Sequence, residues 1–362
     1  MALSLLTSIP ATCYTSQLQE IVLSTSAASV TLTITHQAQL YYSGNGQTRV
    51  FQATYSTRSN CAKMYDIGSL LETFMLNRDG VQQFYFTFTD GTDTLEETYA
   101  VIYCKQQPVR SAADLASSSY ITNYLTRLVY LGANDQLPYF AGFGSPGGYT
   151  VRTITYSVVY RNPDGTLGTY SMIAGGRAGY GVSYVISSPD AIREMFAPVL
   201  PQGAVVLSYS LKLGNRTARF FIAEQTIVRQ FVFRNAYGCR EYICVPTART
   251  EKTETKSSTA VCSDTLTQYD ITHTRSYEEQ TPALQRAEAR RFGEFLTSHY
   301  IAVLIDGTEY PILIKDYELK ISDNAGESNT VKFEWQFTSL RTPLISEDYD
   351  RIFSPEYDDN FV

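Results

Sequence analysis

The chain has 362 residues, of which 44% are hydrophobic and 18% charged, and this balance excludes an intrinsically disordered protein. Its net charge of −7 excludes nonspecific nucleic-acid binding, which needs a basic surface. The length suffices for two or three domains, and apolar runs such as Tyr300–Ile305 are far shorter than the roughly 20 residues of a membrane-spanning helix.

The first residues give no sign of export. Met1-Ala2-Leu3-Ser4-Leu5-Leu6 has a short apolar stretch and no basic residue, so we expect no secretory signal. Thr12 before Cys13 is a poor fit to a lipoprotein cleavage site. We therefore expect a protein that is not secreted by a signal peptide.

The residue types favour strands. The chain holds 28 Tyr and 18 Phe, and its Tyr, Val, Ile and Thr residues occur in short alternating runs. We expect a mainly β chain of β-sandwich type with a few short helices, that is, a β-rich α+β fold.

The first predicted module covers residues 1–106. Ser29–Thr35 alternates between apolar and polar residues, and Ser43-Gly44-Asn45-Gly46 supplies a hairpin turn. Asp66 is expected to cap a short helix over Ile67–Leu76. A second hairpin is expected around Asp90-Gly91.

A second module repeats the pattern of the first. An ungapped shift of 121 positions places residues 29–104 on residues 150–225 and aligns one short helix and two strands in the same order. We therefore predict a duplicated β-module over residues 150–227, with a helix that begins at Pro189 after Ser188 as the cap. The intervening residues 107–149, which end in a glycine-rich stretch, are expected to be a linker.

The third predicted domain, residues 228–343, differs in kind. Ala248–Ser263 is almost entirely Thr, Ser, Lys and Glu, so we expect an exposed loop or a long hairpin arm. Thr281-Pro282 opens an amphipathic helix predicted over 282–298, with Ala287 on the apolar face that packs on the core and Glu288 on the opposite face. Asp306-Gly307 is the strongest hairpin signal in the chain. Residues 344–362 then form a separate acidic, aromatic tail.

One motif in this third domain resembles a known family. The run Arg234-Asn235-Ala236-Tyr237-Gly238, followed by Glu241-Tyr242, resembles an R-N-x-[FY]-G-x-x-E pattern in tail and baseplate proteins of phages and prophages of Bacteroides-like bacteria. The predicted helix and the close at Phe333-Glu334-Trp335-Gln336-Phe337 are similar to the same family.

The resemblance covers about 110 residues by specific pattern. It implies a structural, distal-tail-like or hub-like component of a ring-shaped assembly in the virion, made in the host cytoplasm. The implied partners are copies of the chain itself and other tail or baseplate proteins. No catalytic residue is carried over.

Two segments are candidates for protein–protein contacts. Arg outnumbers Lys by 21 to 8, and Arg and Tyr are favoured at interfaces while Lys is disfavoured. The tail has six acidic residues and one Arg over 346–362, with aromatic residues every four positions. The interface candidates in the tail and the arm are Tyr349, Phe353, Tyr357, Phe361, Arg249, Lys252 and Lys256.

No pattern of residues indicates catalysis, a cofactor or a metal. The histidines His36, His273 and His299 form no paired-ligand spacing, and no GxSxG motif occurs. Gly175–Gly181 lacks the Lys-Ser/Thr of a phosphate-binding loop, and we expect a flexible connection there.

The six cysteines lack the C-x-x-C pairs of a zinc site. Their odd count in each half argues against a disulfide framework, so we expect small buried side chains in a reducing compartment. They are Cys13, Cys61, Cys104, Cys239, Cys244 and Cys262.

An alternative stays open. A multidomain β surface protein that binds carbohydrate or acts as an adhesin, with a possible receptor contact, would show an exposed row of aromatic residues on one sheet face.

The tail composition leads to a first prediction. Truncation after Thr342 removes the aromatic residues, each of which stabilises an interface by about 1.5–3 kcal/mol when buried. We expect the truncated chain to form a weaker oligomer that dissociates at lower salt, measured by light scattering at several salt concentrations. An assembly of unchanged size and salt resistance would contradict a binding role for the tail.

Overall fold

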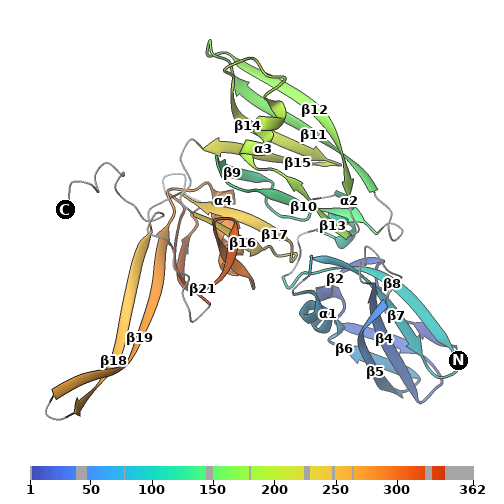
Figure 1. Ribbon diagram of the computed structural model, residues 1–362. Helices are drawn as coiled ribbons and strands as arrows, with labels where there is room; N and C mark the ends of the chain where they lie inside the picture. Colours follow the sequence, from blue (N-terminus) through green and yellow to red (C-terminus); the bar gives the residue numbers. More distant parts are fainter. Residues whose placement is uncertain are drawn as a thin grey trace.

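The computed structural model describes residues 2–37, 47–76, 78–106, 108, 110–118, 120–143, 150–178, 181–223, 229–246, 249–262, 265–322 and 328–338. Strands hold 59% of the residues and helices 13%, which confirms the mainly β fold with short helices. Figure 1 shows three β units around a common centre, and a two-stranded arm that extends from the third unit. The interface candidates Tyr349, Phe353, Tyr357 and Phe361 lie outside the described residues.

The first unit is a sheet in the order β1-β3-β6-β5-β4-β7-β8-β2, with β2 parallel to β8 at one edge. Its core contains buried Phe84, Phe86 and Phe88, which alternate with more exposed residues on β7 as the period of a strand requires. The elements are β1 (Ser4–Leu5), β2 (Thr12–Tyr14), η1 (Thr15–Gln17), β3 (Glu20–Ser24), β4 (Ser29–Gln37), β5 (Gln47–Arg58), β6 (Cys61–Tyr65), α1 (Ile67–Met75), β7 (Val81–Thr89) and β8 (Thr94–Ile102).

The second unit has the order β12-β11-β14-β15-β9 in one sheet and pairs β10 with β13 in another. Its core includes Val158, Tyr209 and Phe220, which lie side by side on three neighbouring strands. The elements are α2 (Ala112–Ser118), β9 (Thr126–Tyr130), β10 (Gln136–Gly142), β11 (Thr150–Arg161), β12 (Leu167–Ala178), β13 (Gly181–Ile186), α3 (Pro189–Phe196), β14 (Val205–Leu213) and β15 (Arg216–Ala223).

The two units share their strand order. The run β5-β4-β7-β8-β2 of the first unit matches β12-β11-β14-β15-β9 of the second, and the last strand is parallel to its neighbour in both. The antiparallel pair of β3 with β6 matches that of β10 with β13. In the first unit helix α1 follows β6 and precedes the hairpin β7–β8, and in the second unit α3 follows β13 and precedes the hairpin β14–β15. The ungapped sequence offset predicts this common order.

The match also corrects the expected linker over 107–149. Residues 126–130 and 136–142 are the strands β9 and β10, which occupy the places of β2 and β3 in the first unit. They begin 114 and 116 residues after their counterparts (126 − 12 and 136 − 20). An ungapped offset of 121 does not align β9 and β10 with β2 and β3, so the sequence comparison missed these two strands. The second unit therefore starts well before residue 150.

The third unit is a seven-stranded sheet in the order β17-β16-β20-β21-β22-β19-β18, with one helix against it. Its core is aromatic, and the Trp335 and Tyr277 rings stack with centroids 4.5 Å apart. The elements are β16 (Arg229–Arg234), β17 (Arg240–Val245), β18 (Thr250–Cys262), β19 (Thr265–Gln280), α4 (Arg286–Leu296), β20 (Ile301–Ile305), β21 (Thr308–Lys320) and β22 (Thr330–Phe337).

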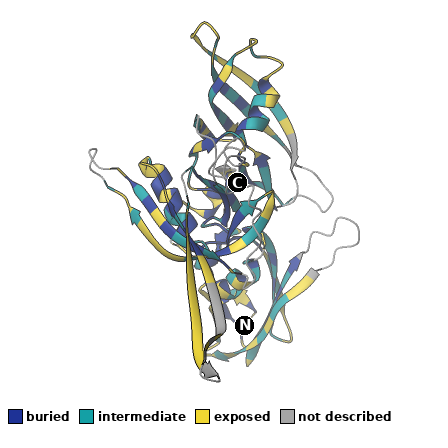
Figure 2. Ribbon diagram, turned by 60° about the vertical axis from the view of Figure 1, so that its left-hand side comes forward, coloured by how far each residue is buried: buried dark blue, intermediate teal, exposed yellow. Residues whose placement is uncertain are grey.

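The arm consists of β18 and most of β19. These strands pair with each other along their length, while only residues 277–280 of β19 also pair with β22. Residues 250–260 are all exposed, and Figure 2 shows this exposure along the ribbon. The polar stretch expected at 248–263 is thus one strand of a hairpin that extends beyond the sheet.

Four local expectations are wrong in detail. Asp66 is in the left-handed region (φ 60°), and its side chain makes no capping hydrogen bond. Helix α4 begins four residues after Pro282, at Arg286, because Leu284 pairs with Asn329 in a β-bridge first. On α4 the buried positions include Glu288, whereas Ala287, expected in the core, is exposed. The expected flexible connection at Gly175–Gly181 is largely strand β12.

The place of β10 in the second core leads to a second prediction. Leu137 on β10 is fully buried, so Leu137→Ala should lower the free energy of unfolding by about 2–5 kcal/mol. Leu128→Ala on the neighbouring strand β9 is the matched control, because Leu128 is 38% exposed and loses much less. Urea unfolding measures both, and equally small effects would mean that 136–142 only connects the units.

Candidate functional site at the junction of the three units

The motif Arg234-Asn235-Ala236-Tyr237-Gly238 forms the turn between β16 and β17. The Asn235 Oδ1 accepts the backbone N–H groups of Tyr237 and Cys239, both at 3.0 Å. Gly238 has a φ of +71°, a left-handed conformation in which a side chain is strained. The amide side chain of Asn235 therefore holds the backbone of the turn in place.

The same asparagine ties the turn to the second unit. Its Nδ2 donates to the carbonyl of Ile121 at 2.8 Å and to the Glu241 Oε1 at 2.7 Å. The Tyr237 hydroxyl donates to the Asn123 Oδ1 at 2.7 Å. Four residues of an R-N-x-Y-G-x-x-E pattern thus define one turn and its contacts across the junction.

An ion pair lies beneath the turn. The Arg127 Nη2 donates to the Glu241 Oε2 at 2.5 Å, and both side chains are fully buried. The Arg127 Nη1 donates to the Asp135 Oδ1 at 3.0 Å. Burial alone would lower the pKa of Arg127, but Glu241 and Asp135 outweigh it and raise the pKa, so the guanidinium stays charged.

Helix α4 adds further charges to this cluster. Arg291 lies 3.7 Å from the Glu241 Oε2 and 3.7 Å from the Glu288 Oε2. Glu288 accepts the backbone N–H of Leu128 at 2.8 Å, and Glu294 accepts that of Ala236 at 2.6 Å.

The cluster holds more carboxylates than guanidinium groups. Asp135, Glu241, Glu288 and Glu294 face only Arg127 and Arg291. Burial, with a smaller contribution from Glu241, raises the pKa of Glu294 to about 7. Glu294 is therefore about half protonated at neutral pH, which reduces the excess negative charge.

One hydroxyl group makes hydrogen bonds that connect the first unit with the second and third units. Tyr184 on β13 donates to the Asp79 Oδ1 at 2.8 Å and accepts the backbone N–H of Arg240 at 3.2 Å, so one residue of each unit meets at this oxygen. Next to Asp79, Gly80 packs so closely that an added Cβ would lie 1.5 Å from the Tyr237 carbonyl oxygen. Only glycine allows this approach.

Apolar residues from all three units complete the junction. The Tyr14 and Tyr237 rings stack with centroids 6.3 Å apart. This cluster has its own buried members, separate from the three cores: Tyr14, Val81, Ile102, Cys104, Ala112, Leu115, Ile121, Tyr237 and Cys239. The three units are thus packed against one another through a shared fourth core.

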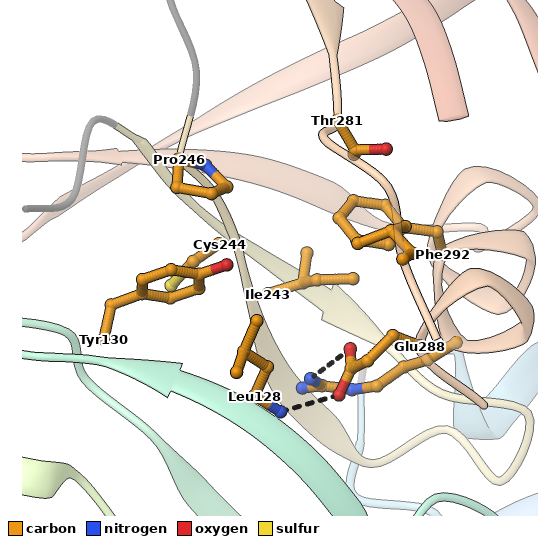
Figure 3. Close-up of a pocket in the computed structure, with 10 residues that line it drawn as sticks. Leu128, Tyr130, Ile243, Cys244, Pro246, Thr281, Glu288 and Phe292 are labelled. Atoms are coloured by element: carbon orange, nitrogen blue, oxygen red, sulfur yellow. Dashed lines mark hydrogen bonds and ion pairs between the residues drawn. The ribbon is translucent and has the colours of Figure 1, made fainter. Parts of the chain in front are cut away.

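The crevice between β9, β17 and α4 is nearly filled. Figure 3 shows Glu288 next to Leu128, with Tyr130 and Cys244 on the opposite side of the crevice. Arg291, the ion-pair partner of Glu288, also lines this crevice. Its free volume of about 10 Å³ has room for roughly one water molecule. A larger hollow of about 570 Å³ beside Tyr14, Lys105 and Arg110 is open and polar. The buried charges therefore hold protein elements together, and the crevice that they line among the described residues is too small for a ligand.

The described cysteine, histidine and acidic side chains show neither a metal-binding cluster nor an activated nucleophile. Within the described ranges no group of three His, Cys, Asp or Glu side chains could hold a metal ion. Cys13, Cys61, Cys104, Cys239 and Cys244 are free, and burial raises the pKa of the Cys104 thiol to about 11. His36 packs against Phe74 and Phe84, and burial lowers its pKa.

The described interface candidates lie at the base and middle of the arm. The Arg249 guanidinium lies over the Tyr277 ring at 4.5 Å from its centroid, and Lys252 forms an ion pair with Glu278 at 2.6 Å. Both contacts fix the arm to the sheet, whereas Lys256 is exposed further out. None of the three reaches the junction, whose residues Arg127 and Asp135 lie in the expected linker. The sequence feature that could have pointed to these residues is the single Arg in the largely apolar run Leu125–Tyr130.

The comparisons add no family. No model of a known protein family matches the chain, and no curated protein matches it. The full extracellular region of plexin A4, a solved structure, is matched over 94% of this chain and 36% of that chain, with 8% identity and a TM-score of 0.21. The chain thus spans about a third of that structure's length, and a likeness this weak carries no argument. In the part of the chain that the structure describes, no helix is long and apolar enough to cross a membrane.

The raised pKa of Glu294 leads to a third prediction. The unfolded carboxyl ionises near its usual pKa of 4.5, while the folded one holds its proton to about pH 7, so stability falls as pH rises between these values. Glu294→Gln keeps the neutral form and should remove a loss on the order of 2–3 kcal/mol.

Urea unfolding at pH 5 and pH 8 measures this loss. Glu96→Gln, a change at an exposed strand position, is the control and should keep the pH dependence of the original chain. Equal pH dependence in Glu294→Gln and the original chain would show that the junction does not hold this proton.

Proposed function

We propose that the chain is a structural component of a phage tail or baseplate, or of a related contractile particle, and assembles into a symmetric ring or adaptor. The observation that carries the proposal is a polar two-stranded arm on a body whose second and third units are joined by buried charges and whose first unit packs on both through a shared apolar cluster. The role is mechanical, with no reaction of its own, and the virion tail is the proposed location.

The arm supports an assembly role because, among the described residues, its outer part forms strand pairs only within the hairpin itself. β18 has 13 residues, which corresponds to a ribbon of about 40 Å at roughly 3.3 Å per residue. An isolated two-stranded hairpin is at best marginally stable in water, and its open edges can pair with another chain. Such a ribbon gains its stability from a partner in an assembly.

The junction supports the same role. A subunit that fixes the positions of its neighbours in a ring needs a body that keeps its shape. Here the units are joined by the Arg127–Glu241 pair, the Tyr184 hydroxyl and a shared apolar cluster. The resemblance of the Arg234–Gly238 turn to tail and baseplate proteins points in the same direction.

The carbohydrate-binding alternative gains no support from the exposed aromatic residues. Tyr65 lies on the first unit and Tyr317 on the third. Tyr170 and Phe221, both on the second unit, lie on opposite faces of its sheet, because Tyr170 is in register with Val158, Tyr209 and Phe220. The described exposed aromatic residues form no row.

Shortening the arm is the fourth prediction and tests the proposed function. Replacement of Thr253–Arg275 by an Asn-Gly turn rejoins the hairpin at the Lys252–Ser276 pair and leaves the β19–β22 pairing intact. We expect the melting temperature and circular dichroism of the body to be kept, while the assembly measured by mass photometry falls to single chains.

The Lys63→Ala variant, which keeps the arm and changes one exposed residue on β6 of the first unit, is the control and should still assemble. Loss of folding in the shortened chain would mean that the arm belongs to the core. Full assembly without the arm would contradict the proposed function.

A further inference from the structure

Several long strands of the described chain have a largely open outer edge, and β19 of the arm is one of them, because only its residues 277–280 pair with β22. Three others are β5, β12 and β18, of 12, 12 and 13 residues. β5 pairs with β6 only at Thr57 and Arg58. Other strands at the ends of the large sheets have two to six residues. An open edge presents unpaired N–H and C=O groups, so each of the three is a place where another strand can be added.

β12 is the edge without protection. Natural edges carry charges, especially Lys, or Pro, but β12 has neither from Leu167 to Gly176. Leu167 is 68% exposed and Ile173 is 70% exposed, and both are in the described part of this edge. β5 differs, since it carries Arg49 and Arg58, and its Val50, Phe51 and Tyr55 are partly buried against the first core. An apolar open edge of this length is explained by a strand that covers it.

The arm offers a strand of the matching kind. Its basal half is charged at Glu251, Lys252, Glu254 and Lys256, whereas Ser257–Ala260 is free of charge. Leu266, on the opposite strand of the distal half, is 72% exposed, more than any other large apolar side chain among the described exposed residues. The part of β18 that carries no charge therefore lies farther from its own body than the charged part.

The strand that covers β12 comes from another copy of the chain. In Figure 1 the arm extends from the third unit away from the second unit, and β12 lies on the far side of the second unit. The arm of one copy and the β12 edge of the next can meet without any change in either body. This contact joins two different surfaces, so it repeats from copy to copy and forms a ring where the rotation between neighbouring copies closes.

We propose that the distal half of β18 adds as an extra strand to the open edge of β12 in the neighbouring copy. This inference rests on the proposed function and names the surface that receives the arm. Backbone hydrogen bonds supply the affinity, and the exposed Leu167, Ile173 and Leu266 supply an apolar contact around them.

The test places a charge on the receiving edge. Ile173→Lys introduces the residue that natural edge strands use against pairing, and it should raise the concentration needed for assembly at least tenfold. Ile186→Lys is the matched control, because Ile186 is a 63% exposed isoleucine of the same unit on a different sheet, and it should assemble like the original chain. Circular dichroism checks that both variants fold.

A mixing experiment tests the direction of the contact. The arm-shortened chain keeps its β12 edge, and the Ile173→Lys chain keeps its arm. Each alone should remain a single chain, and an equimolar mixture should give a one-to-one dimer in native mass spectrometry. Pairing of two arms with each other would give dimers of Ile173→Lys alone and none that need the shortened chain, and that result would overturn the inference.

The outcomes separate the inference from the function it rests on. If shortening the arm abolishes assembly but Ile173→Lys leaves it intact, the arm binds elsewhere, and the inference fails while the proposed function stands. If the original chain stays single at all concentrations, both fail for a ring of identical copies.

Discussion

The fully buried pair of Arg127 and Glu241 is the interaction on which the arrangement of the units depends. Removing two ions from water costs several kcal/mol for each ion, and only close geometry with further hydrogen bonds offsets that cost. Both conditions are met, because Asn235 and Asp135 satisfy the remaining atoms of the pair. Separation of the second and third units would break this pair together with the hydrogen bonds around it, so the two units behave as one body.

The duplication explains why the junction has the composition it has. In the first unit the strand at the parallel edge is β2, which ends in Tyr14, a member of the shared apolar cluster. In the second unit the equivalent strand is β9, which carries Arg127 into the buried pair. The same strand of the repeat thus supplies an apolar contact from the first unit and a charge from the second unit, and the Asn235 turn contacts both strands' neighbourhoods at the junction.

The sequence predicted those features that depend on neighbouring residues. The turn at Asp306-Gly307 forms because both residues take positive φ angles, 51° and 75°, which is a local property. The strand pattern also revealed the repeat. Asp66 shows the limit of local rules, since its backbone N–H bonds to the Gln19 carbonyl at 2.9 Å and its side chain makes no cap. The junction could not be predicted, because its central pair joins residues 114 positions apart and a single Arg in a strand does not name its partner.

This separation along the chain also sets the order in which the molecule is completed during synthesis. Glu241 leaves the ribosome 114 residues after Arg127, a delay of about 6–23 seconds at roughly 5–20 residues per second. Until then the guanidinium stays in water, and the second unit cannot be joined to the third. The arm, which begins at Thr250, emerges only after Glu241. A nascent chain therefore has both residues of the central Arg127–Glu241 pair before it has the strand that reaches for another copy.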